Sequence, residues 1–159
     1  MRIVAFGAVG LLAFTVACAP GTPSSFDPDD PAVVAVLDSM MTATMEAAAK
    51  VDPVGVLAHS GGGEEFTLVT GDVMLVGLET VQEAFADTYD GLLKQEQTVY
   101  ERRVRLLSPD VAVLSAVGEG VYTDLAGWTS EPVGLGLTVV FVREGGQWTA
   151  RHVHQSIAK

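Results

Sequence analysis

Two histidines near the end of the chain have the type and spacing that could carry chemistry. His152 and His154 are separated by one residue in a predicted strand, so both imidazoles are expected on one face of a sheet. Imidazoles titrate near neutral pH and can transfer protons or bind a metal ion. Zinc needs a further ligand, and no Asp, Glu or Cys at a recognisable spacing supplies one. We therefore predict no metal or cofactor. A structural role, in which the pair hydrogen-bonds the backbone or Ser156, stays open beside pocket lining.

The opposite face of this strand carries a different set of side chains. Arg151, Val153 and Gln155 alternate with the histidines, and neither set is uniformly apolar. The alternation therefore does not show which face points inward. Arg151, on this second face, is a weaker candidate site residue.

Tyrosines and carboxylates on the preceding predicted strands are further candidates. Tyr100 and Tyr122 lie on neighbouring strands, where their hydroxyls could hold an oxygen of a ligand; packing in the core or an interface is the alternative. Glu119 and Asp124 are weaker candidates for a general base, against a solvated surface position. No order of Ser, His and Asp and no Gly-x-Ser-x-Gly motif indicates a nucleophile.

Helices that would position these residues are predicted in the first half of the chain. Asp30-Pro31 is a favoured helix start, and apolar residues then recur at three- and four-residue steps to about Lys50. Asp52-Pro53 repeats the signal for a short helix from Val54 to about His59, which three glycines end. A further helix is predicted from Leu78 to near Gly91.

Strand-like patterns account for most of the remainder. Gly71-Asp72 is typical of a tight turn between two short strands, Phe66–Thr70 and Val73–Val76. Four longer strands are predicted at Thr98–Leu107, Val111–Thr123, Val133–Arg143 and Trp148–Ile157. This order predicts an α+β fold in which a curved antiparallel sheet wraps around helices.

Two segments carry a family resemblance. They are Gly77-Leu78-Glu79-Thr80-Val81 with Phe85, and the closing run Gly-Gly-Gln-Trp-Thr-Ala-Arg-His-Val-His-Gln-Ser at 145–156. With the order of elements, they make residues 31–158 resemble the nuclear transport factor 2-like superfamily, and more narrowly the SnoaL-like proteins. The closing strand is also similar to the association domain of calcium/calmodulin-dependent kinase.

The resemblance implies a cone-shaped α+β barrel, usually dimeric, with a pocket between the concave face of the sheet and the helices. Enzymes of this fold commonly pair a carboxylate base with a tyrosine or protonated acid. Other members bind without chemistry, so the fold alone assigns no function. In the kinase pattern an arginine follows the second histidine. Here that position is Gln155, so anion recognition by that arginine does not carry over.

The chain begins with features of an exported protein. Arg2 is the only charge before Cys18, and the residues between them are almost wholly apolar. Val16-Ala17-Cys18 resembles the bacterial lipobox, which implies cleavage after residue 17 and lipid attachment at Cys18. Residues 18–30, rich in Pro, Gly and Ser, are expected to form a tether, and 31–159 the domain. Ordinary secretion and a buried thiol are the alternatives.

The net charge of the chain and its expected location limit its possible binding partners. The formal net charge is −11, which disfavours binding to nucleic acid. We expect an exported, membrane-anchored lipoprotein, on the periplasmic side of the outer membrane if the cell has two membranes. Three functions follow for its domain: binding a small, mostly apolar molecule in a central pocket, acid–base catalysis in that pocket by His152 or His154, or assembly into a homodimer without a ligand.

Overall fold

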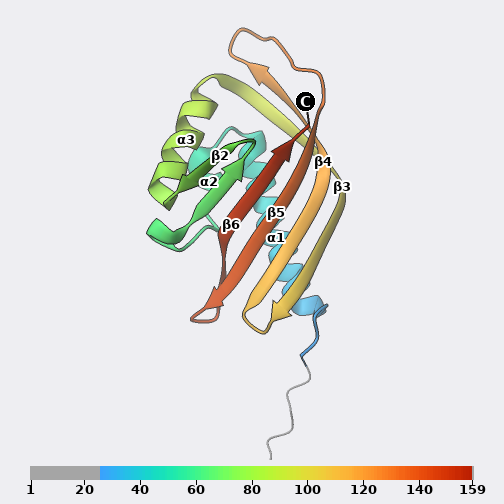
Figure 1. The fold of residues 1–159 in the computed structure, drawn as a ribbon. Coiled ribbons are helices and arrows are strands. Elements are labelled where there is room, and N and C mark those ends of the chain that lie inside the picture. Colours follow the sequence, from blue (N-terminus) through green and yellow to red (C-terminus); the bar gives the residue numbers. More distant parts are fainter. Residues whose placement is uncertain (1–25, 159) are drawn as a thin grey trace, which may run out of the picture.

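A single curved sheet with helices on its concave side forms the domain (Figure 1). The computed structural model describes residues 26–158; the expected leader and Cys18 lie outside the described residues. The six strands lie in the order β2-β1-β6-β5-β4-β3. Their bounds are β1 Thr67–Thr70, β2 Val73–Val76, β3 Leu92–Ser108, β4 Val111–Asp124, β5 Val133–Glu144 and β6 Gln147–Ile157.

The pairing of the strands differs from the prediction at one place. An antiparallel sheet was expected, but β1 runs parallel to β6, with Thr67 opposite His152 and Thr70 opposite Gln155. The sheet is therefore mixed and open. Local sequence patterns gave no sign of this pairing, because all the other strands lie between β1 and β6 in the sequence.

Helix starts follow the capping residues found in the sequence. In α1, Pro31–Ala49, the Asp30 side chain accepts a hydrogen bond from the Ala32 amide at 2.9 Å, which confirms the predicted start. In α2, Pro53–Val56, Asp52 caps in the same way, but the helix is shorter than expected and ends in turns. A 3₁₀ turn, Gly63–Glu65, precedes β1, and α3 spans Leu78–Asp90.

The core lies between α1 and the concave face of the sheet. Leu37 on α1 and Leu114 on β4 are fully buried, and Phe66 before β1 is buried beside them. An ion pair between Arg102 Nε and Asp38 Oδ1, 2.9 Å apart, adds a polar link between β3 and α1. By length and composition α1 could cross a membrane, but its apolar side packs in this core.

Two irregularities alter which side chains face inward. In β6, Ala150 pairs with Phe141 and His152 pairs with Val140, so Arg151 is an extra residue that forms a β-bulge. In β3 a similar shift leaves Tyr100 unpaired between Val99 and Glu101. The strand β3 also begins at Leu92, six residues before the predicted start.

Candidate functional site: a cavity between the sheet and the helices

A cavity of about 680 Å³ lies between the concave face of the sheet and the three helices. Helix α1 supplies Met41 and Met45 to its wall, and α3 supplies Phe85. The sheet contributes apolar side chains from β1, β2, β4, β5 and β6, among them Leu68, Leu75, Ala116, Leu135, Leu137, Val139, Val153 and Ile157. This size and lining match those of small-molecule sites in proteins.

A second hollow, of about 550 Å³, is a less suitable site. It lies between the outer surface of α1 and β3, and Glu46, Glu101 and Tyr100 on its walls are exposed. The inner cavity is therefore the candidate site.

One end of the cavity carries a buried tyrosine that the sequence analysis missed. Tyr89 on α3 lines the cavity, is only 7% exposed, and packs edge-on against Phe85 with ring centroids 5.5 Å apart. Burial raises the pKa of Tyr89 to about 12; a hydrogen bond with Gln95 opposes the rise and the charge of Asp52 adds to it. Its hydroxyl therefore stays protonated at neutral pH and can donate a hydrogen bond. Tyr89 lies within the helix predicted from Leu78 to near Gly91, but the sequence did not single it out as a site residue.

The two histidines do not line this cavity, which corrects the prediction of pocket lining. They share one face, as expected from their spacing, but Val153 and Gln155 on the other face form the wall. The β-bulge at Arg151 gives this orientation, because an extra residue reverses the alternation that follows it. His152 Nδ1 lies 2.7 Å from Thr67 Oγ1 of β1, a hydrogen bond that joins the two parallel strands.

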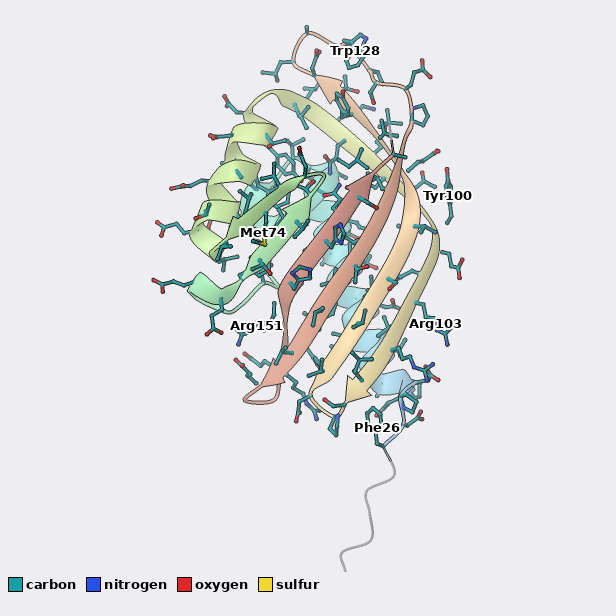
Figure 2. The ribbon with its side chains drawn as sticks, in the orientation of Figure 1. Phe26, Met74, Tyr100, Arg103, Trp128 and Arg151 are labelled. Atoms are coloured by element: carbon teal, nitrogen blue, oxygen red, sulfur yellow. The ribbon has the colours of Figure 1, made fainter. Side chains whose placement is uncertain are left out.

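The predicted tyrosines lie in different surroundings. Tyr122 borders the cavity at the end of β4 and packs edge-on against Trp128, with centroids 5.7 Å apart. Tyr100 is 63% exposed and extends away from the edge of the sheet (Figure 2). A hydrogen bond with Glu119 raises the pKa of Tyr100. The structure therefore does not bring the two tyrosines together around one ligand position.

The weaker candidates have local partners. Asp124 Oδ1 accepts a hydrogen bond from the Trp128 amide at 2.9 Å and shapes the loop after β4. Arg151 pairs with Glu144, and its guanidinium lies against Gly62, where a side chain would collide with it. Glu119 borders the cavity besides contacting Tyr100.

Two further observations bear on the chemistry of the cavity. His59 is the one imidazole among the lining residues in the described part of the chain. Within residues 26–158, no group of three His, Cys, Asp or Glu side chains is placed to hold a metal ion.

The fold is shared with many solved structures. A nuclear transport factor 2-like protein from Salmonella enterica matches with a TM-score of 0.73 and 14% identity, covering 81% of this chain and 93% of its own. A ketosteroid isomerase-like protein from Erwinia carotovora matches with a TM-score of 0.66 and 19% identity, over 79% of this chain and 96% of that one. These likenesses define a nuclear transport factor 2-like fold.

The family follows from the sequence. The model of the calcium/calmodulin dependent protein kinase II association domain matches residues 62–159, and the chain belongs to this family. A structure of a protein described as such a domain, from Xanthomonas campestris, matches with a TM-score of 0.61 and 21% identity, over 91% of this chain and 96% of that one. The comparison with curated proteins finds no match.

Proposed function

We propose that this domain binds a small, mostly apolar molecule in the inner cavity. The observation that carries the proposal is the cavity itself, about 680 Å³ in volume and walled chiefly by apolar side chains from the helices and the sheet. An interior left open at this size forgoes packing that would stabilise the fold, so a ligand that fills it stabilises the domain.

A matched pair of variants on β5 tests this proposal. Leu137 lines the cavity, whereas the next residue, Thr138, points to the outer face opposite His154. Leu137→Trp fills the cavity and is expected to abolish binding of the neutral fluorescent probe Nile red, while Thr138→Trp adds the same ring outside and leaves binding intact. Fluorescence titration measures both. Equal binding by both variants, or none by the unmodified chain, would contradict the proposal.

Homodimer formation is a second candidate function, favoured by the outer face of the sheet. Apolar side chains are exposed there on β2, with Met74 at 65% and Val76 at 50%, and on β4, with Val117 at 52% exposure. The name of the family also refers to association. We propose that two copies pack through this face. In sedimentation velocity, we expect Thr138→Trp to weaken the dimer and Leu137→Trp to leave it intact. An unmodified chain that is monomeric at all concentrations would refute this candidate.

An acid–base enzyme in this cavity receives less support. The proton carriers proposed from the sequence, His152 and His154, lie on the other face of β6. Catalysis would therefore have to use another lining group, such as His59.

Export and lipid attachment at Cys18 also remain proposals, which rest on the sequence. Radioactive palmitate is expected to label the full chain in the producing bacterium and not a Cys18→Ser variant. An unlabelled wild-type chain would remove the anchor.

A further inference from the structure

Few charged residues border the cavity in the described part of the chain. Glu96 and Glu119 are the charged residues that border it in the described part of the chain, and neither Lys nor Arg does. By register both carboxylates lie at outward-facing positions of their strands, Glu119 two residues after the exposed Val117. A carboxylate or phosphate entering this space finds no Lys or Arg side chain to replace the water that it loses, and His59 is the one imidazole among the described lining residues. Burying such a charge without a partner is costly.

Basic side chains nearby are paired with acids elsewhere. Arg102 binds Asp38 at 2.9 Å, although its strand neighbour Ala116 lines the cavity. Lys94 binds Glu96 at 3.1 Å near the end of β3. Two further pairs join Arg143 to Asp110 and Arg151 to Glu144.

Other basic residues point away from the cavity. Arg103 and Arg105 lie opposite Ser115 and Val113, so they belong to the outer face, and Figure 2 shows Arg103 extending away from the sheet. The exposed Lys50 follows the end of α1. To pair with a bound anion, a basic side chain would therefore have to leave an existing ion pair, or its strand would have to reverse which face points inward.

The polar groups that do line the cavity are mostly neutral. Tyr89 and Gln95 interact at one end, and the half-buried side chains of Gln97 and Gln155 lie on β3 and β6. Hydroxyl and amide groups of this kind can donate to or accept from an alcohol or a carbonyl oxygen without a net charge.

We propose that the cavity selects against anions and takes apolar molecules whose polar group is an uncharged hydroxyl or carbonyl. This inference rests on the proposed binding function and names the ligand class of that site. The excess of acidic residues over the whole chain acts in the same direction, because its field repels an approaching anion.

A pair of probes of equal chain length tests the inference. At pH 7.5, 1-octanol is expected to displace Nile red from the full domain, and octanoate to do so about a hundredfold more weakly or not at all. Octanoate that competes as well as octanol overturns the charge selection while leaving the binding function intact. If Nile red itself does not bind, the binding function fails instead, and the inference fails with it.

Two adjacent substitutions on β6 then test whether the charge inside the cavity, or the net charge of the whole molecule, determines anion binding. Gln155→Lys places an ammonium group on the lining, and His154→Lys places one on the outer face. We expect Gln155→Lys alone to gain octanoate binding by about tenfold or more. An equal gain in both variants, or none in Gln155→Lys with its circular dichroism unchanged, overturns the inference. Gln97→Lys on β3 provides the same test if Gln155→Lys does not fold.

Discussion

The two faces of the sheet are built from the same strands and differ in almost every chemical respect. The concave face carries Leu114, Leu137 and Val153, which pack on the helices or line the cavity. The outer face carries the histidine pair, together with charged residues of β3. His152 and His154, the proton carriers proposed from the sequence, thus lie on the face away from the inner cavity. Orientation within the strand, rather than residue type, decides which side chains can meet a ligand.

The largest expected difference between the faces is in stability. Leu114 on β4 is fully buried against the core, whereas Val117 on the same strand is 52% exposed on the other face. Leu114→Ala is expected to lower the free energy of unfolding by about 2–5 kcal/mol. Val117→Ala should lower it by no more than about 0.5 kcal/mol. Urea denaturation measures both, and similar losses would mean that the two faces are equally packed.

The two tyrosines with raised pKa values offer a second contrast, of intermediate size. With a folded-state pKa of about 12 against an ordinary 10, Tyr89 holds its proton more tightly when folded. Its contribution to stability is thus full below pH 10 and is lost as the pH rises through about 12. The loss amounts to about 1.4 kcal/mol per pH unit within that window.

A comparison of two substitutions measures this contribution. Urea denaturation between pH 9 and pH 12 should show a weaker pH dependence in Tyr89→Phe than in the wild type. Tyr100→Phe should change the slope less, because Tyr100 is 63% exposed and solvent weakens its interaction with Glu119, which raises its pKa. A slope unchanged in Tyr89→Phe would show that this hydroxyl is not held in a buried site.

The smallest expected effect concerns His152. Its replacement by alanine removes the hydrogen bond to Thr67 and should lower the free energy of unfolding by about 1 kcal/mol. Nile red affinity should not change, because the side chain lies outside the cavity. Val153→Ala, one residue further, should lower that affinity. Loss of Nile red binding in His152→Ala, with the fold intact, would show that this imidazole belongs to the binding site.

The sequence was sufficient for much of the fold because many of its signals are local. Asp30-Pro31 begins α1 as predicted, and Gly71-Asp72 joins β1 to β2 with Gly71 at a φ of +59°, a conformation glycine adopts without strain. The start of β3 was placed too late, since Leu92–Gln97 contains Lys, Gln and Glu, which are weak strand formers. Those residues are held in the strand by their pairing with the end of β4.

The site was harder to predict because it depends on contacts between distant residues. The parallel pairing of β1 with β6 brings Thr67 to His152, 85 residues along the chain. Tyr89 is one apolar-face position of a predicted helix, and only the packed structure shows it on a cavity wall, interacting with Gln95. Alternation on β6 predicted that the histidines share a face, but the bulge that chooses the face leaves no clear mark in the sequence.

That bulge makes the interior sensitive to a change in residue count. If β6 ran as a regular ladder with Arg151 paired to Val140, every later residue would move by one place along β5. Both imidazoles would then enter the hollow, and Val153 and Gln155 would leave it. A change of one residue in the length of this strand would thus give the hollow two further side chains able to transfer protons, with none of the side chains concerned replaced.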